Sequence, residues 1–126
     1  MTHKIFLEEI IVKLAVIGSR GLTVTNLEDY LPQGVTEIVS GGARGIDTCA
    51  REYSLTKGIK LTEFLPEYKK YGRYAPLKRN LQIIDYADEV LAFWDGQSQG
   101  TKYVIEQCEK KNKKVTVIKT VTHKLQ

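Results

Sequence analysis

Three short segments of the sequence combine glycine with hydroxyl-bearing or charged residues. They span residues 18–21 (GSRG), 40–47 (SGGARGID) and 95–101 (DGQSQGT). Glycine allows tight turns and a close approach of the backbone to a ligand, and the free N–H groups at the start of a helix attract phosphate. One such segment is an ordinary turn between a strand and a helix. Because three occur in one small chain, we expect them to form a phosphate-binding site.

The arginines follow the same distribution. Four of the five are expected in loops or first helical turns at the edge of the sheet where the predicted strands end. They are Arg20, Arg44, Arg73 and Arg79. The planar guanidinium group suits phosphate and carboxylate groups. The lysines of residues 110–114 instead follow the last predicted helix, where they complement the helix dipole and add solubility. The arginines therefore mark the candidate site.

Two carboxylates lie in the same segments. Asp47 is expected in a first helical turn, where it either caps the helix or holds a ribose hydroxyl and acts as acid or base. Asp95 follows a predicted strand, and either residue is a candidate for catalysis of N-glycosidic cleavage. The only histidines, His3 and His123, lie near the chain ends. We therefore expect neither a histidine-containing triad nor a metal site.

Residues 66–75 (PEYKKYGRYA) interleave tyrosines with basic residues. This mixture is typical of single-stranded nucleic-acid binding, or the segment forms a lid over a small-molecule site. Trp94 ends a predicted strand and either stacks on a base or packs in the core. Asn80 is expected to face inward, where its amide needs a partner from a loop backbone or a ligand.

The elements that must position these residues alternate along the chain. Short apolar runs predict strands at residues 12–17, 35–40, 60–65, 88–94 and 114–119. Helical spacing of apolar residues lies between them. The first expected helix covers residues 25–31 and ends at Pro32, and the second runs from Ile46 to Gly58. The third starts near Pro76 and turns Leu77, Leu81 and Ile84 inward. The fourth carries the apolar stripe Thr101, Val104, Ile105 and Cys108.

This alternation predicts an α/β fold, a Rossmann-like three-layer α/β/α arrangement with a five-stranded, mainly parallel sheet. Right-handed crossovers place strand 12–17 beside strand 88–94 at the switch point. We expect one domain over residues 1–126 with its core in 12–119. Residues 1–11 are expected to form a short helix or an edge strand, and the tail after Thr120 to fray.

Composition narrows the class of protein. The 126 residues carry a formal net charge of +4, which favours an anionic partner without requiring one. Cys49 and Cys108 lie on inward stripes and imply no disulfide scaffold. No apolar run approaches the roughly 20 residues of a membrane helix, and the N-terminus becomes acidic too early for a signal peptide. We expect a cytoplasmic protein. Residues 18–21 lack the GxGxxG spacing of a dinucleotide site, and no cofactor is expected.

Together the motifs resemble the SLOG superfamily, which joins DNA-processing protein A, the Lonely-Guy phosphoribohydrolases and small stand-alone bacterial and phage proteins. The motifs are GSR, SGGARGID, the Arg79-Asn80 pair, ADEVLAFWDG and SQGT. SGGARGID closely parallels the SG-x-ARGID stretch of DNA-processing protein A, which has the same Arg-Asn pair. The similarity runs from about Val12 to Ile118 and is strongest to the short, stand-alone branch.

The resemblance implies a Rossmann-like domain that binds nucleotides, nucleotide-derived ligands or nucleic acid, in a homodimer or a larger homo-oligomer. Motif by motif, it implies ligand-binding roles for residues of the loops. These are Gly18, Ser19, Arg20, Ser40, Gly41, Gly42, Arg44, Gly45, Asp47, Arg79, Asn80, Gly96, Ser98, Gly100 and Thr101.

The sequence also departs from the superfamily's enzymes. Lonely-Guy enzymes carry PGGxGTxxE, whose Glu is placed for glycosidic cleavage, and Val104 occupies that position here. Glu106 lies off the inward stripe and does not replace it. The additional domains found around DNA-processing protein A are not recognised in this sequence. Phosphoribohydrolase activity and recombinase loading are therefore not expected to carry over.

Three functions stay open. The first is a sensor or binding module for a nucleotide or nucleotide-derived ligand. The second is an enzyme that cleaves an N-glycosidic bond with Asp47 or Asp95 as acid or base. The third is single-stranded DNA binding through Tyr71, Arg73, Tyr74 and the edge of the sheet where the glycine-containing loops lie.

Overall fold

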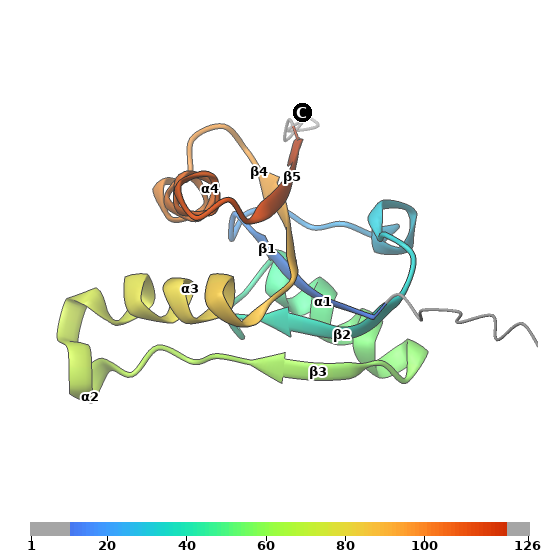
Figure 1. Cartoon of the computed structure of the whole chain (residues 1–126), viewed down its shortest axis with the longest axis horizontal. Helices are drawn as coiled ribbons and strands as arrows, with labels where there is room; N and C mark the ends of the chain where they lie inside the picture. Colours follow the sequence, from blue (N-terminus) through green and yellow to red (C-terminus); the bar gives the residue numbers. More distant parts are fainter. Residues whose placement is uncertain (1–10, 121–126) are drawn as a thin grey trace, which may run out of the picture.

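The computed structural model describes residues 11–120, which form a five-stranded parallel sheet flanked by helices (Figure 1). The strands are β1 (Val12–Gly18), β2 (Val35–Ser40), β3 (Lys60–Glu63), β4 (Glu89–Trp94) and β5 (Lys114–Lys119). Their order in the sheet is β3-β2-β1-β4-β5. The predicted neighbours β1 and β4 therefore pair, and the switch point lies between them.

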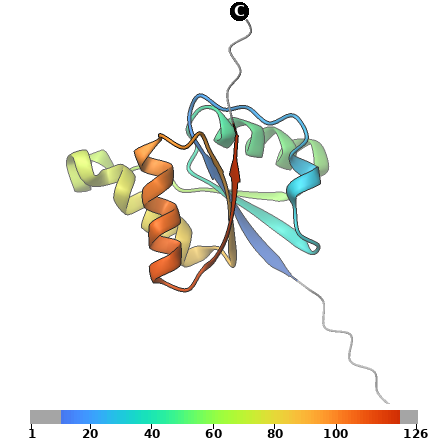
Figure 2. The ribbon, with the colours of Figure 1, turned by 90° about the horizontal axis from the view of Figure 1, so that it is seen from above.

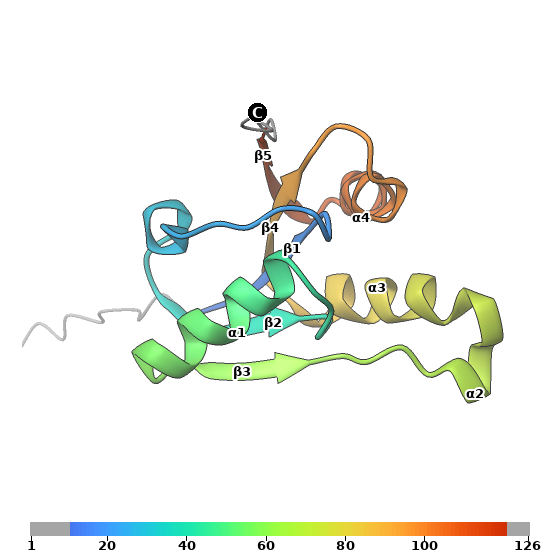
Figure 3. The same cartoon turned by 180° about the vertical axis from the view of Figure 1, so that it is seen from behind.

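Helices cover both faces of the sheet. The α-helices are α1 (Ile46–Lys57), α2 (Tyr68–Tyr71), α3 (Ala75–Tyr86) and α4 (Gln99–Lys110), and the 3-10 helices are η1 (Leu27–Tyr30) and η2 (Gly72–Tyr74). Figure 2 shows α3 and α4 on one side of the twisted sheet and α1 with η1 on the other. Figure 3 shows α1 lying over β1, β2 and β3. The predicted three-layer Rossmann-like fold is confirmed.

The side chains of β1 divide between the two layers of the core. Leu14 and Val16 pack toward α1 with Ile38 and Phe93. Ala15 and Ile17 point to the opposite face and pack in the cluster that α3 and α4 cover. This division follows from the two-residue period of a strand. It explains why the central strand reads as one uninterrupted apolar run.

The helix predicted at residues 25–31 is wrong, because only the single 3-10 turn Leu27–Tyr30 forms there. The expected cap at Thr25 is not used, and Asn26 at the start of the turn makes no capping bond to the backbone. Its side-chain amide instead donates to the Asp29 carboxylate at 3.1 Å. With Pro32 close behind, the segment is too short to propagate a helix.

Two other predictions differ from the structure at their edges. The third strand ends at Glu63, two residues before the predicted end. The possible helix or strand of residues 1–11 falls almost entirely outside the described residues, as does the tail beyond Thr120. In the part of the chain that the structure describes, no helix has the length and hydropathy that a membrane crossing requires.

Gly18 allows β1, β4 and α1 to approach one another. A Cβ atom at this position would lie 2.7 Å from the backbone oxygen of Phe93 and would overlap the side chain of Ile46. Neither neighbour can move easily, because one is sheet backbone and the other is a fully buried side chain. Gly18 is therefore needed to close the core beneath the first loop.

We predict that Gly18→Ala lowers the free energy of unfolding by about 1–3 kcal/mol, the usual cost of overpacking a core. Urea unfolding followed by circular dichroism measures this change. The matched control is Gly100→Ala in the first turn of α4, where a Cβ has no neighbour within 4 Å. Alanine favours a helix, so the control should be at least as stable as the parent. Equal destabilisation of both variants would contradict this account of Gly18.

Candidate functional site

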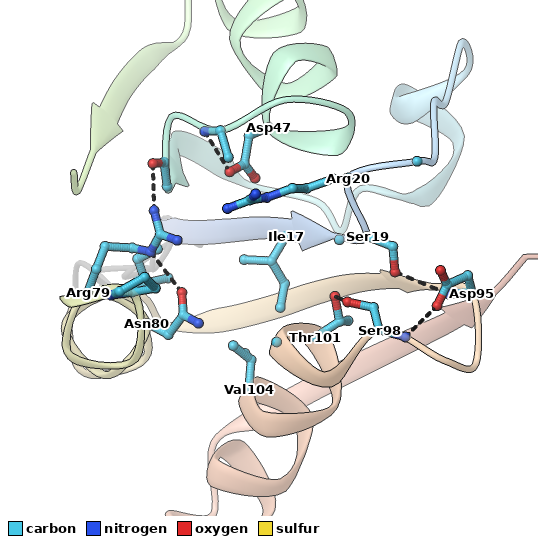
Figure 4. Close-up of a pocket in the computed structure, with 17 residues that line it drawn as sticks. Ile17, Ser19, Arg20, Asp47, Arg79, Asn80, Asp95, Ser98, Thr101 and Val104 are labelled. Atoms are coloured by element: carbon cyan, nitrogen blue, oxygen red, sulfur yellow. Dashed lines mark hydrogen bonds between the residues drawn. The ribbon is translucent and has the colours of Figure 1, made fainter. Parts of the chain in front are cut away.

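A cleft opens at the carboxyl edge of the sheet, beside the end of β1 and between α3 and α4 (Figure 4). Its volume is about 480 Å³, within the range of roughly 300–1,000 Å³ that small-molecule sites occupy. The lining residues are Ile17, Gly18, Ser19, Arg20, Gly21, Gly41, Ala43, Asp47, Pro76, Arg79, Asn80, Ile83, Asp95, Ser98, Gly100, Thr101 and Val104. All three glycine-containing segments of the sequence thus contribute to one cavity.

Arg79 forms one wall of the cleft and is only 9% exposed. Its Nη1 donates a hydrogen bond to the carbonyl oxygen of Gly41 at 2.8 Å, and its Nε donates to Oδ1 of Asn80 at 2.8 Å. The predicted need of Asn80 for a polar partner is therefore met by a guanidinium group. Burial lowers the pKa of Arg79, and the negative charge of Asp47 opposes this effect.

Gly41 is constrained by that arginine. A Cβ atom at position 41 would lie 2.6 Å from Nη1 of Arg79 and 3.2 Å from Oδ2 of Asp47. The loop after β2 therefore passes between a guanidinium group and a carboxylate without room for a side chain. This close approach is a function of glycine that composition alone does not reveal.

Asp47 lies in the first turn of α1 and is almost fully buried. Its Oδ2 accepts a hydrogen bond from the backbone N–H of Ala43 at 2.9 Å, so the carboxylate supports the loop that precedes the helix. Burial raises the pKa of Asp47, and the Ala43 hydrogen bond and the charge of Arg79 act against that rise. Asp47 therefore combines a local structural contact with a place in the cleft wall.

Arg20 completes a group of three charges. Its side chain extends into the cleft between Asp47 and Arg79, as Figure 4 shows. Within residues 11–120, no hydrogen bond or ion pair holds its guanidinium group. Arg20 is exposed, and its charge lowers the pKa of Arg79 further. The cleft thus contains two cations and one carboxylate at this end.

The opposite wall is the loop that leads into α4. The carboxylate oxygen Oδ1 of Asp95 accepts hydrogen bonds from the N–H groups of Gln97 and Ser98, both at 2.8 Å. These backbone hydrogen bonds lower the pKa of Asp95. The Oγ of Ser19 accepts the N–H of Asp95 at 3.3 Å and ties this loop to the end of β1.

The first turn of α4 faces the cleft through Gly100 and Thr101. The first N–H groups of a helix have no partner within the helix and carry partial positive charge. The Ser98 hydroxyl donates to Oγ1 of Thr101 at 3.3 Å, so two hydroxyl groups lie beside those N–H groups. This wall offers several hydrogen-bond donors to an anion.

Apolar side chains form part of the cleft between the two polar walls, and the sequence analysis did not identify them as site residues. They are Ile17, Pro76, Ile83 and Val104. Val104 is the residue that the motif resemblance sets at the Lonely-Guy glutamate, and this resemblance was a usable signal that the position lines the cleft. Ile17 and Ile83 look like ordinary core residues in the sequence, and they do pack in the core cluster.

The inward face predicted for α3 is wrong at Leu77, which is 37% exposed. The buried residues of the helix are Ala75, Arg79, Ile83 and Ile84. The helix presents Arg79 to the loop after β2, where its hydrogen bond to Gly41 forms. A polar contact therefore buries Arg79 in place of Leu77 in the first half of the helix, whereas Ile84 is buried as predicted.

Several residues predicted to bind ligand do not line the cleft, namely Ser40, Gly42, Arg44, Gly45, Arg73, Trp94 and Gly96. Ser40 is buried, and its hydroxyl accepts the N–H of Gly42 at 3.3 Å. Gly42 faces Leu65, and a Cβ at Gly96 would meet the side chain of Lys119. Their positive φ angles, 70° and 84°, mark them as turn residues.

The others have different local roles. Gly45 has φ of 75°, and a Cβ there would overlap the backbone oxygen of Arg20, so this glycine lets the first two loops touch. Trp94 donates from Nε1 to the carbonyl oxygen of Ser98 at 3.0 Å and packs against the core. Arg44 is exposed, and exposed Arg73 donates to the hydroxyl of Tyr74 at 3.0 Å.

Among residues 11–120, no group of three or more His, Cys, Asp and Glu side chains is placed to hold a metal ion. Cys108 is buried, and burial raises the pKa of its thiol to about 11. Cys49 is half-buried, and its Sγ accepts the N–H of Val24 at 3.4 Å.

Comparison with known proteins identifies a structural neighbour. No protein-family model and no curated protein sequence matches the chain. The X-ray structure of DNA processing protein A (DprA) from Streptococcus pneumoniae matches with a TM-score of 0.70 and 20% sequence identity. The match covers 87% of this chain and 51% of that one, so this chain spans about half the length of its neighbour. The expected resemblance is confirmed at the level of the fold: the chain has the Rossmann-like fold of DprA.

Proposed function

We propose that the protein binds a nucleotide or a nucleotide-derived ligand in the cleft at the carboxyl edge of its sheet. The observation that carries the proposal is the side chain of Arg20. It extends into the cleft without a hydrogen-bonding partner among residues 11–120, while Arg79 beside it is fixed by Gly41 and Asn80. A flexible cation and a fixed one around the same cavity are suited to an anionic ligand.

The rest of the cleft supports a nucleotide rather than a simple anion. The N–H groups in the first turn of α4 and the hydroxyl of Thr101 offer donors on a second polar wall for a phosphate. The apolar surface of Ile17 and Val104 between the walls suits the face of a ribose or a base. Asp47 and Asn80 supply acceptors for hydroxyl groups of the sugar.

We predict that Arg20→Ala weakens binding of a nucleoside monophosphate at least about 10-fold, because charge-assisted hydrogen bonds contribute about 1.5–3 kcal/mol each. Isothermal titration calorimetry against a panel of nucleotides, including cyclic and ADP-ribose derivatives, measures the change. Arg44→Ala is the matched control, since it removes the same charge from the neighbouring loop outside the cleft. Its affinity should stay within about twofold of the parent protein. The absence of binding across the panel would refute the proposal.

Asp47 and Asp95 lie in different environments, and this difference makes N-glycosidic cleavage in the same cleft a candidate reaction to test. Burial raises the pKa of Asp47, whereas backbone hydrogen bonds from Ser98 and Gln97 lower the pKa of Asp95. Carboxylates whose pKa values differ in this way can divide the roles of acid and base. Asp95, however, already uses one oxygen to hold its own loop.

Asp47→Asn separates binding from hydrolysis. For a binding module, we expect about 3- to 10-fold tighter binding of a nucleoside monophosphate, because a negative charge beside two arginines is removed. For a hydrolase, we expect loss of base release, because the variant has no titratable carboxyl group at this position. Calorimetry and chromatographic assay of the free base on the same samples decide between them. If Asp47→Asn binds with the affinity of the parent protein, and the parent protein releases no base, both roles of Asp47 are contradicted.

A second candidate function is single-stranded DNA binding, which the arm of residues 65–77 favours. Leu65, Tyr68, Tyr74 and Leu77 are exposed on it at 62%, 57%, 53% and 37%. Figure 1 shows its helix α2 beyond the carboxyl ends of β2 and β3, and the cleft also lies at the carboxyl edge of the sheet. Exposed aromatic and basic side chains together suit stacking of bases and contact with phosphates. The structural neighbour is a DNA processing protein.

We predict that Tyr74→Ala weakens binding of a fluorescent oligothymidylate at least about 5-fold, as loss of a stacked base requires. Affinity should also fall steeply between 50 and 200 mM salt, roughly in proportion to the phosphates contacted. Leu55→Ala, at an exposed apolar position on α1, is the control and should bind as the parent does. If the parent protein binds no oligonucleotide, the DNA-binding function is refuted. If the parent and Tyr74→Ala then bind a mononucleotide equally, the function is restricted to the small ligand.

A further inference from the structure

We propose that Glu37 of β2 and Tyr86, the last residue of α3, are positioning residues for Arg79, although neither lines the cleft. Their contact fixes the far end of α3 and thereby sets where the guanidinium group meets the ligand. The inference deepens the proposed function and rests on Arg79 being a ligand-binding residue.

The helix α3 is attached to β2 by polar contacts at two points. At the carboxyl end of β2, Arg79 donates to the carbonyl oxygen of Gly41 at 2.8 Å. Near the amino end, the hydroxyl of Tyr86 donates to Oε2 of Glu37 at 2.5 Å. The two attachment points are separated by seven residues of α3, which is two helical turns, so both side chains leave the same face.

Glu37 is well suited to hold one position. It is 7% exposed, and the hydroxyl of Thr62 also donates to its Oε2, at 2.7 Å. The ammonium group of Lys60 lies 3.6 Å from Oε1. Burial alone would raise the pKa of Glu37, but the hydrogen bonds from Tyr86 and Thr62 and the nearby lysines outweigh it, so the pKa lies below its usual value. The carboxylate is thus ionised and satisfied inside the fold.

The ring of Tyr86 is held as firmly as its hydroxyl. Phe64 packs against it edge to face with ring centroids 5.4 Å apart. The ammonium group of Lys13 lies 4.1 Å from the centre of the ring. These contacts come from β1, from the residue after β3 and from β2, so Tyr86 joins the end of α3 to three adjacent parts of the sheet.

Apolar packing also holds the helix, because Ile83 and Ile84 are buried in the core cluster that α3 and α4 cover. Ile83 lies between the two attachment points and packs with Val39 of β2 in the core cluster. Apolar packing is non-directional and tolerates small shifts of a helix, whereas two directional hydrogen bonds set where the helix meets β2. Loss of the Tyr86 contact should therefore let Arg79 and its partner Asn80 shift relative to the cleft.

The first test reads Arg79 directly and needs no ligand. The Nε–H group of Arg79 is hydrogen-bonded to Asn80 and gives its own signal in ¹⁵N NMR spectra. Tyr86→Phe should shift this signal and speed its exchange with solvent. The matched control is Lys111→Ala, which removes the 2.7 Å ion pair to Asp85, the neighbour of Tyr86 on the exposed side of α3. The control should leave the signal unchanged.

The second test couples the two ends by a double-mutant cycle, with AMP as the probe. Tyr86→Phe should weaken AMP binding roughly 5-fold in the parent protein and by a similar factor in Arg20→Lys. In Arg79→Lys the same change should have less than about a twofold effect, because the residue through which it acts has been altered. A purely structural role would give the same loss in every background.

An unchanged Arg79 signal in Tyr86→Phe, or an undiminished loss of affinity in Arg79→Lys, would overturn the inference. If Tyr86→Phe does not fold, Glu37→Gln tests the same contact, because it removes the charge to which Tyr86 donates; it should shift the Arg79 signal relative to the parent protein, and an unchanged signal would overturn the inference. If the parent protein binds no nucleotide, the proposed function fails, and the NMR measurement still decides whether Glu37 and Tyr86 position Arg79.

Discussion

The buried guanidinium group of Arg79 is the constraint on which the candidate site depends. A charged group that is 9% exposed is tolerated only where hydrogen bonds replace its hydration. The carbonyl oxygen of Gly41 and the amide of Asn80 provide them. This requirement sets the inward face of α3, excludes a side chain at position 41 and orients Asn80. One desolvated cation thereby connects the loop after β2, the helix α3 and the cleft.

The charged side chains of the cleft partly neutralise one another, and burial shifts the pKa values of Asp47 and Arg79. Asp47 offsets part of the positive charge of Arg20 and Arg79, while its own burial raises its pKa. The opposite wall carries one carboxylate, Asp95, which directs one of its oxygens toward the N–H groups of its own loop. The cleft therefore has an end with two arginines and Asp47, and an end built from backbone donors, hydroxyls and the Asp95 carboxylate. An elongated ligand with an anionic group and a polar, uncharged part matches this asymmetry.

The sheet was predictable because its signals are local and repetitive. Apolar runs such as residues 12–17 and 88–94 indicate buried parallel strands, and right-handed crossovers leave few ways to order them. Spacing predicted the burial of Ile84 on α3 but not that of Arg79, since a hydrophobic pattern does not identify an arginine as a buried residue. The helix at 25–31 failed because the side chain of Asn26 bonds Asp29 instead of capping the backbone.

Within the site, the glycine-containing segments were predictable as a group but not residue by residue. Positions 18 and 41 require glycine because neighbouring atoms leave no space, and position 42 because of its positive φ. All three needs look identical in a sequence. Trp94 and Arg44 were assigned by chemical type, yet the backbone directs one toward the Ser98 carbonyl and leaves the other exposed outside the cleft. Ile17 and Ile83 were missed because the same apolar residue can pack in the core and line a cavity.

The hydrogen bonds of Asp95 have a thermodynamic consequence for any ligand that meets the loop before α4. The carboxylate of Asp95 holds the N–H groups of Gln97 and Ser98, and its own N–H is bonded to Ser19. Trp94 is bonded to the carbonyl oxygen of Ser98. The loop is therefore ordered before a ligand arrives. Its conformational entropy is lost when the chain folds and not when it binds. Association at this wall can therefore proceed without a slow rearrangement, and little of the intrinsic affinity is spent on ordering the protein.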